Sequence, residues 1–541
     1  MKINLLHSFK KRIRFKITRN SIRGFYNLES NSKLRDIKLI THVLSTNKFN
    51  LSSKSFSRYI FGNAKINAEL VLRQFMAASF LYNGVDSLGI QQSIFISKSK
   101  KGKKIIYPLP KHWQFLLCEN GYDVNKILSS ILWFFYILKS FFKGLRTFFN
   151  LYRNTFKSVF KIPQKSIFFV DINKKCLPFV FNEKQSKDIV SWYYNKFVNK
   201  KEINVIFHNN IDNTDIKIDS LIVKSGNLFD INGFTIKKNI IFLFSSIRIL
   251  IVAFIDIFRG RWWSALLLSD VIYAQLFKLI PKETISNEYL FSNSSWIYRP
   301  LWTYEAEKFG SKIILYFYST NIEDFQINNK HEEYIKNFSL INWPNYIVWD
   351  KYQLNFIERA LNDKTNKSIV VLNSYIHFSD FPETLPTSQK KVISIFDVTP
   401  YRLSRLIQLS DIDEYYTSKI IIQFLNDIKF IAEKYGFIIY YKAKRTNNLN
   451  IFDKKYLNWI NMAIDNNFMS IHPDISAIRV IEASNAIISI PYTSTALIGC
   501  YLGKPSVYYD PTENVDKNDR ASHGIGILSG KIELENWIKN L

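Results

Sequence analysis

The segment from Ile471 to Pro511 constrains the fold of this chain more than any other part of it. Ala486–Ile490 is a short apolar run rich in β-branched residues, which is typical of a buried parallel strand. The turn Pro491–Thr495 follows, and then a helix over Ala496–Leu502 that ends at Gly503 and Pro505, before a second strand. This succession predicts one unit of a parallel α/β sheet.

The turn within this unit also predicts an anion site. It carries the hydroxyls of Thr493, Ser494 and Thr495, and the first N–H groups of the following helix have no partner inside the helix. A plain N-terminal cap is the alternative, but three hydroxyls behind a proline exceed what capping needs. We therefore expect this turn to hold a phosphate group without a metal ion.

Strands and helices alternate along much of the chain, which predicts parallel sheets covered on both faces. A cluster of Pro, Ser and Thr near Phe378–Gln389 predicts a domain boundary. The expected domains are a basic, mostly helical region (1–100), a first Rossmann-like domain (101–380) and a second one (381–541). The expected strands are Ser166–Val170, Asn204–His208, Ile313–Phe317, Val392–Phe396, Phe437–Tyr441 and Ser470–Ile471; the expected helices include Ile247–Phe277, Tyr415–Tyr435 and Ser476–Ala483.

Charge is distributed unevenly along the chain. The net charge is +28, and residues 1–160 carry 28 Lys and Arg against 6 Asp and Glu, whereas the rest of the chain carries 45 against 39. The first third is therefore the part that we expect to meet an anionic partner, either nucleic acid or an anionic membrane leaflet. The chain has three cysteines, which form neither a disulfide pattern nor a zinc pattern, so we expect a reducing cytosol.

A long helical pattern over Lys126–Lys161 contains no acidic residue. Its basic residues are spaced for one helix face, opposite Phe, Leu and Tyr, which predicts a helix that lies on an anionic bilayer. A helix docked on the protein with a solvated basic face is the alternative. Ile240–Phe258 is the most apolar segment, but Arg248 and Asp256 interrupt it, so we expect a peripheral protein rather than an integral one. The spaced basic residues are Lys139, Lys143, Arg146, Arg153, Lys157 and Lys161.

Polar residues follow the expected strands of the last third of the chain. In open α/β sheets, ligands bind beyond the carboxyl ends of the strands, so these residues are expected to converge. Cations, N–H groups and hydroxyls there suit a leaving phosphate, and Glu482 is placed to accept hydrogen bonds from a ribose diol. Each has a structural alternative, such as a helix cap for His472 or an ion pair with Arg479 for Glu482. The residues in question are Asp397, Thr399, Lys442, Lys444, His472, Pro473 and Thr493–Thr495.

The pair His472–Pro473, followed about twenty residues later by the Ser/Thr-rich turn, resembles the CMP-binding pattern of GT-B sialyltransferases and of capsule and lipopolysaccharide Kdo transferases. The string PYTSTALIGCYLGKPSVYYDP is similar to bacterial surface-carbohydrate biosynthesis proteins of that group. The resemblance covers roughly residues 390–511, and Ser292–Asn321 and Tyr107–Val124 look like its acceptor half. It implies an α/β GT-B fold, with two Rossmann-like domains facing a cleft.

The same resemblance implies a metal-independent glycosyltransferase without a cofactor, which uses a CMP-activated Kdo- or sialic acid-like ulosonate as donor. By that likeness His472, with Pro473, contacts the donor phosphate beside Thr493–Thr495, and Glu482 meets the ribose. Lys442 and Lys444 complete the predicted donor site. The first candidate for the catalytic carboxylate is Glu305, with a surface helix position as its alternative, and the second is Asp397.

We expect such an enzyme to be cytoplasmic, on the inner face of the cytoplasmic membrane, where a lipid-linked O-antigen or capsule glycan is its acceptor. A CDP-glycerol- or CDP-ribitol-type phosphotransferase of GT-B form is an alternative, and a nucleic-acid-binding protein is a third interpretation. No recognised nucleic-acid module occurs, so we expect no nucleic-acid partner. The triplet Asp411-Ile412-Asp413 matches a metal-binding DxD, but its position before a long helix favours capping.

Overall fold

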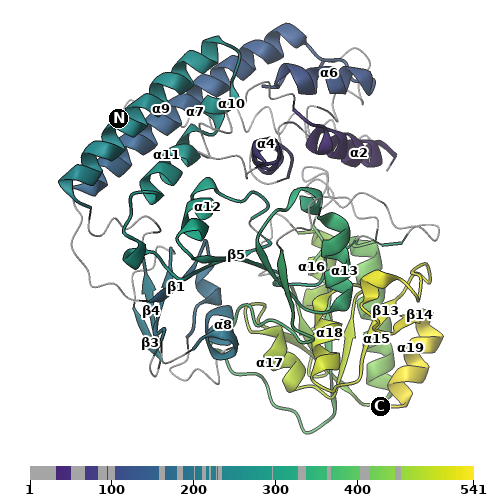
Figure 1. Ribbon diagram of the computed structural model, residues 1–541. Helices are drawn as coiled ribbons and strands as arrows, with labels where there is room; N and C mark the ends of the chain where they lie inside the picture. The colour runs from purple at the N-terminus through teal and green to yellow at the C-terminus, as the bar shows by residue number, and fades with distance from the viewer. Residues whose placement is uncertain are drawn as a thin grey trace, which may run out of the picture. The chain divides into compact units, whose positions relative to one another are not determined.

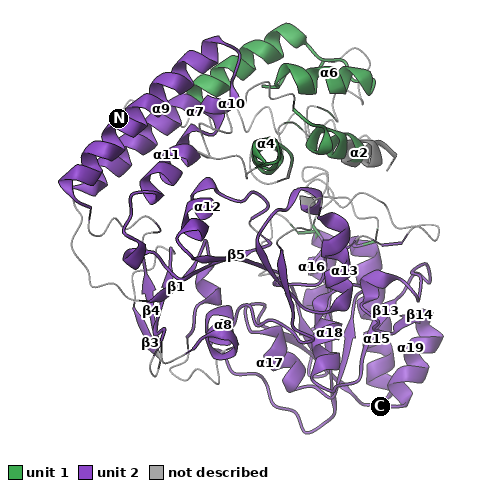
Figure 2. Ribbon diagram, in the orientation of Figure 1, with its two compact units in different colours: residues 1–139, 401–415, 450–453 green, residues 140–400, 416–449, 454–541 purple. Residues whose placement is uncertain are grey.

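The computed structural model forms two compact units (Figure 2), residues 1–139, 401–415 and 450–453, and residues 140–400, 416–449 and 454–541. The first contains α2 (Ser32–Thr46), α4 (Ala68–Met76), η1 (Ala77–Tyr82), α6 (Lys111–Glu119) and the first half of α7 (Lys126–Thr155). Most of the predicted basic region 1–100 and the Asp411–Asp413 triplet lie outside the described residues. These are 32–49, 67–82, 90, 94, 104–156, 165–179, 187–199, 202–209, 215–218, 221–226, 228, 234–294, 296–323, 325–326, 337–361, 367–401, 415–444 and 452–541.

The second unit contains an eight-stranded sheet built from the middle of the chain (Figure 1). Every neighbouring pair is parallel except β3 and β4, which form an antiparallel edge. In spatial order the strands are β3 (Ile216–Ile218), β4 (Leu221–Ser225), β2 (Val205–His208), β1 (Ser166–Phe169), β5 (Glu288–Ser292), β6 (Lys312–Tyr316), β7 (Asn345–Val348) and β8 (Ser368–Val371).

A second, six-stranded sheet follows and is parallel throughout. Strands β9 and β12, at its centre, are fully buried, which explains their unbroken apolar character in the sequence. In spatial order the strands are β11 (Phe468–Ile471), β10 (Ile438–Lys442), β9 (Val392–Phe396), β12 (Ala486–Ser489), β13 (Ser506–Asp510) and β14 (Ile527–Ser529).

Both sheets have the strand order of a Rossmann fold. Numbered in chain order within its own sheet, the second sheet runs 3-2-1-4-5-6, and the first repeats this order apart from its added edge strands. The direction in which successive strands are added to the sheet reverses between β9 and β12 in the second sheet and between β1 and β5 in the first; we call these places the reversal points. The predicted α/β class with two Rossmann-like domains is confirmed by this topology.

Helices of the second unit pack against both sheets. Helices α12 (Leu301–Lys308) and α13 (Lys351–Ala360) pack on β6 and β8, whereas α15 (Ser418–Lys434), α18 (Ser494–Tyr501) and α19 (Gly530–Lys539) pack on the second sheet. Gly499 lets α18 approach that sheet closely, because a Cβ there would collide with Ser506 and crowd Ile487. The remaining helices of this unit are α8 (Ile189–Phe197), α9 (Ile236–Phe258), α10 (Trp263–Leu266), α11 (Leu268–Phe277), α16 (Lys454–Ala463) and α17 (Ala477–Glu482), with short turns η2 (Lys174–Cys176), η3 (Lys282–Thr284), η4 (Asn337–Leu340) and η5 (Arg520–Ser522).

Candidate active site

A cavity of about 220 Å³ lies at the point where the second sheet reverses its strand order. Phe396 and Asp397 enter it from the end of β9, and Thr493, Ser494 and Thr495 enter it from the turn after β12. The first sheet supplies the opposite wall, which includes Tyr318, Ser319, Asn321 and Trp349. The cavity therefore lies between residues of the two Rossmann-like domains, where the resemblance implies a cleft, and it sits where open α/β sheets bind ligands.

The turn before α18 is held rigidly. Tyr492 has a left-handed backbone (φ 67°), which is costly for a residue with a bulky side chain. Its hydroxyl donates to Asp519 at 2.5 Å, and its ring lies 4.5 Å from that of Phe325. The hydroxyl of Tyr508 donates to the Thr493 carbonyl at 3.0 Å. These contacts fix the start of α18, so its N–H groups are oriented before any ligand binds.

The three hydroxyls of this turn do different things. Thr493, the N-cap residue, makes no side-chain capping bond to α18; its Oγ1 donates to the carbonyl of Ile490 at 3.0 Å. Thr495 Oγ1 lies 2.8 Å from Ser489 Oγ. The hydroxyl of Ser494 accepts from the N–H of Thr320 at 2.9 Å and lies 2.8 Å from Ser319 Oγ, so it joins α18 to the first sheet. The alternative of a plain N-terminal cap is therefore not what the Thr493 hydroxyl forms.

Asp397 is buried at the end of β9 and lines the cavity. Its Oδ2 accepts from the hydroxyls of Tyr456 (2.6 Å) and Tyr441 (3.1 Å), whereas its Oδ1 has no hydrogen-bond partner among the described residues. Burial raises the pKa of Asp397 to about 6, although the two tyrosines and two nearby lysines act in the opposite direction. A carboxyl group with this pKa is suited to accept a proton near neutral pH.

Two lysines bring positive charge to the same cavity. Lys442, the last residue of β10, and Lys444 both line it. The Lys442 ammonium donates to the carbonyl of Pro473 at 2.8 Å. Burial lowers the pKa of Lys442 to about 8, against the attraction of nearby carboxylates. The start of α17 (Ser476–Ile478) lines the cavity as well, and the sequence analysis did not single it out.

Five of the predicted residues do not line this cavity: Glu305, Thr399, His472, Pro473 and Glu482. His472 stacks on Phe381 with ring centroids 4.9 Å apart, and its Nδ1 accepts from the N–H of Asp474 at 3.2 Å. Glu482 forms an ion pair with Lys187 at 2.7 Å. Glu305 is buried in α12, where Lys308 lies 2.9 Å and Lys278 3.9 Å from its carboxylate. These ion pairs and the ring stack give His472, Glu482 and Glu305 structural roles. Pro473 contacts the site only through its carbonyl, which accepts the hydrogen bond from the Lys442 ammonium.

A second cavity, of about 640 Å³, lies at the reversal point of the first sheet. Its lining includes Asp171, just beyond β1, and Ser292 and Ser294 at the end of β5. Asp171 has a left-handed backbone (φ 52°), and its carboxylate accepts from the amide of Asn209 at 2.5 Å. Phe378 and Ser379 line both cavities. The two reversal points therefore open onto neighbouring chambers.

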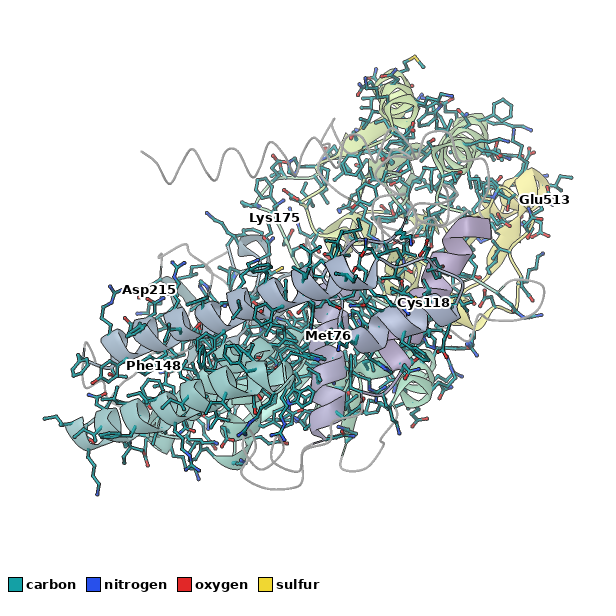
Figure 3. All side chains as sticks on the ribbon, turned by 90° about the horizontal axis from the view of Figure 1, so that it is seen from above. Met76, Cys118, Phe148, Lys175, Asp215 and Glu513 are labelled. Atoms are coloured by element: carbon teal, nitrogen blue, oxygen red, sulfur yellow. The ribbon has the colours of Figure 1, made fainter. Side chains whose placement is uncertain are left out.

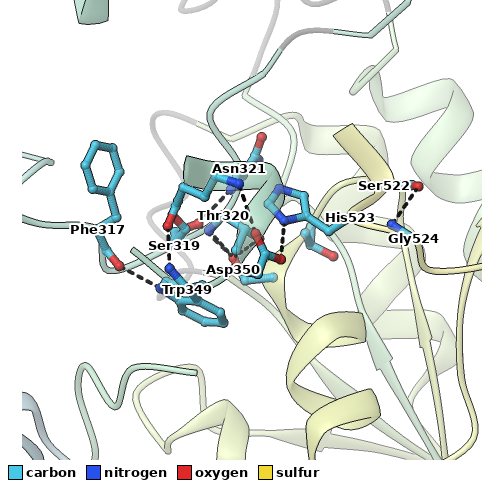
Figure 4. A network of polar contacts seen from close by, with 12 residues as sticks. Phe317, Ser319, Thr320, Asn321, Trp349, Asp350, Ser522, His523 and Gly524 are labelled. Carbon is cyan, nitrogen blue, oxygen red and sulfur yellow. Dashed lines mark hydrogen bonds and ion pairs between the residues drawn. The ribbon is translucent and has the colours of Figure 1, made fainter. Parts of the chain in front are cut away.

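Further polar contacts hold the two sheets together near the cleft (Figure 4). Asp350 caps α13 with Oδ1, and its Oδ2 lies 2.7 Å from Nδ1 of His523, which belongs to the C-terminal half. Asp519, which holds Tyr492, also accepts from the N–H of Gln326 at 2.8 Å. Sequence reasoning missed this set because its members lie far apart in the chain. Among the described residues, no group of three or more His, Cys, Asp or Glu is placed to hold a metal ion.

Comparison with known proteins gives one family match. Residues 243–538, more than half of the chain, match the model of a family described as polysaccharide biosynthesis PFTS motif protein. No curated protein matches the sequence.

Solved structures give distant matches. TarM is 10% identical over 50% of this chain and about half of its own length (51%), with a TM-score of 0.29. The wall teichoic acid polymerase TagF is 13% identical, with 75% of this chain and 89% of that chain covered and a TM-score of 0.37. Anabaena HepE in complex with UDP-glucose is 9% identical, with coverages of 69% and 89% and a TM-score of 0.34. Likenesses at this level specify neither donor nor acceptor.

Proposed function

This chain belongs to the polysaccharide biosynthesis PFTS motif protein family, and we propose that it is a glycosyltransferase whose donor and acceptor bind at the two sheet-reversal points. One observation carries the proposal: the cavity at β9 and β12 and the cavity at β1 and β5 share Phe378 and Ser379. A nucleotide-activated sugar in the first cavity then meets an acceptor hydroxyl in the second. The acceptor is a surface glycan, carried on a lipid.

The donor is a CMP-activated ulosonate of the Kdo or sialic acid type. Support comes from the motif resemblance and from the positive lining of the first cavity. The phosphate lies against the start of α18, where the first N–H groups of the helix and the Thr495 hydroxyl face the cavity, with Lys442 and Lys444 nearby. These groups stabilise the charge that develops on the phosphate oxygen as its bond to the sugar breaks.

Asp397 is the general base in this proposal. The acceptor hydroxyl attacks the anomeric carbon, the bond between that carbon and the phosphate oxygen breaks, and the hydroxyl proton passes to Asp397. Its Oδ1, which has no hydrogen-bond partner in the described part of the chain, is the atom available to receive the proton, because Tyr441 and Tyr456 occupy Oδ2. His472 is assigned a positioning role instead. Its ring stacks on Phe381, and it lies three residues before Ile475, which lines the cavity.

Titration with CMP, CDP, CDP-glycerol, UDP and GDP tests the donor assignment. CMP is expected to raise the thermal midpoint of the protein and to bind more tightly than UDP or GDP. A shift with UDP but not CMP would replace the cytidylate donor and leave the glycosyltransferase assignment standing. Tight binding of CDP-glycerol would favour a polyol phosphotransferase. Salt-dependent affinity for nucleic acid, without binding of any of these nucleotides, would favour a nucleic-acid-binding protein instead.

The affinity for CMP is expected to fall as the pH rises from 7 to 9. Lys442, whose pKa is about 8, is charged below that pH and loses its proton above it, so its attraction for the phosphate disappears. Isothermal titration should show a several-fold increase in Kd for the wild-type protein. In Lys442→Arg the charge persists through this range, so its Kd should stay constant. A wild-type Kd that does not change with pH would remove Lys442 from the phosphate site.

A further inference from the structure

Helix α9 has two apolar faces. One faces the protein, where α10 and α11 pack against it, and includes the buried side chains of Phe242, Ile249, Ala253 and Ile257. The other is exposed and forms a continuous stripe, with residues spaced by three or four positions along the helix. Phe244 is 66% exposed and Phe258 69% exposed. The stripe consists of Ile236, Ile240, Phe244, Ile247, Ile251, Phe254 and Phe258.

The second half of α7 lies alongside α9 (Figures 1 and 3). The rings of Phe141 and Phe254 are 5.7 Å apart, and those of Phe148 and Phe242 are 6.0 Å apart. Helix α7 also contacts α11, because Thr147 Oγ1 lies 2.9 Å from Ser269 Oγ. Both helices therefore pack one face against α11 and leave the opposite face exposed.

The outer stripe of α7 alternates aromatic and basic residues. Phe142, Arg146, Phe149, Arg153 and Phe156 follow one another at helical spacing, and all five are exposed. The spacing in the sequence predicts that the basic residues lie opposite the apolar ones. In the structure, exposed phenylalanines are interleaved with the arginines, while a second apolar set is buried. Lys157 and Lys161 lie outside the described residues.

Charge identifies the partner of this surface. Helix α7 has no acidic residue, and the single one in α9, Asp256, is buried and accepts from the Ser264 hydroxyl at 2.7 Å. Exposed cations, by contrast, lie in or beside the stripes: Lys143, Arg146, Arg153, Lys237, Arg248 and Arg259. Apolar side chains edged, among the described residues of these two helices, by exposed cations and by no exposed acid match an anionic phospholipid bilayer, in which acyl chains take up the rings and headgroups pair with the cations.

We propose that the exposed stripes of α7 and α9, together the α7–α9 face, lie flat in the headgroup region of an anionic membrane. Both helices are long and apolar enough to cross a membrane by length and composition. Their inner faces, however, are packed on the protein, and Arg248 is exposed in the middle of α9. A helix with one face on the protein and a cation halfway along the other suits the interface rather than a crossing. This inference does not depend on which nucleotide is the donor.

Co-sedimentation of the full chain with vesicles of phosphatidylcholine, with or without about 30% phosphatidylglycerol, tests the proposal. We expect binding to the anionic vesicles alone, and a loss of at least tenfold in apparent affinity for the double variant Phe244→Glu with Ile251→Glu. The matched control replaces Phe430 and Ile532, which are 67% and 79% exposed on α15 and α19, with Glu. The control should bind as the wild type does, and CMP binding should be unchanged in both variants.

Three outcomes would overturn the proposal. Equal binding of wild type and the α9 variant to anionic vesicles would exclude the stripe as the contact. Retention of the wild type in bacterial membranes after alkaline carbonate extraction would show that a helix crosses the bilayer. A wild-type dimer in solution that the α9 substitutions dissociate would assign the face to a second copy of the chain. In the supporting case, Phe244→Trp gives a blue-shifted emission on adding anionic vesicles.

Discussion

The substitution Asp397→Asn is expected to lower turnover by about 10²- to 10⁴-fold, the usual contribution of a general base, while CMP still binds. The wild-type enzyme should lose activity as the pH falls through about 6, because Asp397 must be ionised to accept a proton. Stability should respond in the opposite direction. Burial raises the folded-state pKa above its ordinary value of 3.8, so the ionised carboxylate costs stability above pH 6. The neutral variant should therefore be as stable as the wild type at pH 7.5, or more so.

Asp427→Asn is the matched control for this prediction. Asp427 is also buried in the second sheet's domain and accepts from a tyrosine, the Tyr509 hydroxyl at 2.7 Å, but it does not line the cavity. Its substitution should leave turnover unchanged. The competing base is Asp171, which lines the second cavity. If Asp171→Asn abolished turnover and Asp397→Asn did not, the proton acceptor would lie on the first sheet.

The substitution Thr495→Asp is expected to abolish donor binding while leaving the fold intact. Thr495 is the second residue of α18, a position where a negative charge normally stabilises a helix through its dipole. A donor phosphate at the same helix start would be repelled. Two unit charges about 4 Å apart interact by about 4 kcal/mol at an effective dielectric constant of about 20, which corresponds to a loss of about 1,000-fold in affinity. Calorimetry with CMP and thermal unfolding measure the two effects separately.

Ser418→Asp makes the same kind of change at the start of α15, in the same domain but outside the cavity. This control should raise or preserve the thermal midpoint and bind CMP normally. A Thr495→Asp protein that binds CMP as tightly as the control would show that the phosphate does not lie at the start of α18. If the Thr495→Asp protein still turned over another donor, the proposed phosphate position would be wrong but the glycosyltransferase assignment would stand.

Some of the residues predicted from strand ends line the cavity and others do not, and sheet order explains the difference. Asp397, Lys442 and Thr493 follow β9, β10 and β12, which are neighbours at the reversal point, and all line the cavity. His472 follows β11, the edge strand, which is two strands from β9 and three from β12. At about 4.8 Å per strand, that puts its strand end roughly 10–14 Å away. The order of the strands along the chain does not show this separation, because β11 directly precedes β12 in sequence but lies three strands from it in the sheet.

Glu305 was chosen because it lies in an aromatic-rich segment, and local sequence carries no sign of the ion pairs that hold it in α12. Ser319 and Asp350 were not singled out, because they acquire their roles from contact with residues of the other sheet's domain, Ser494 and His523. The Ser494 hydroxyl, for example, meets the backbone of Thr320, 174 positions earlier in the chain. Contacts of this kind depend on how the two sheets and their connecting loops pack against each other.

The sequence by itself determined the local elements: apolar β-branched runs and glycine stops specify strands and helix ends from interactions within a few residues. The hydroxyl-rich turn predicts an anion site in the same local way. Tertiary structure alone decided which strand ends meet, which carboxylate is buried beside two tyrosines, and which apolar face of α9 is left exposed. The physical reason is the sequence separation over which each interaction acts. Hydrogen bonding and periodicity act locally along the chain, whereas burial, and the pKa of Asp397 that follows from it, is set by side chains brought together from distant segments.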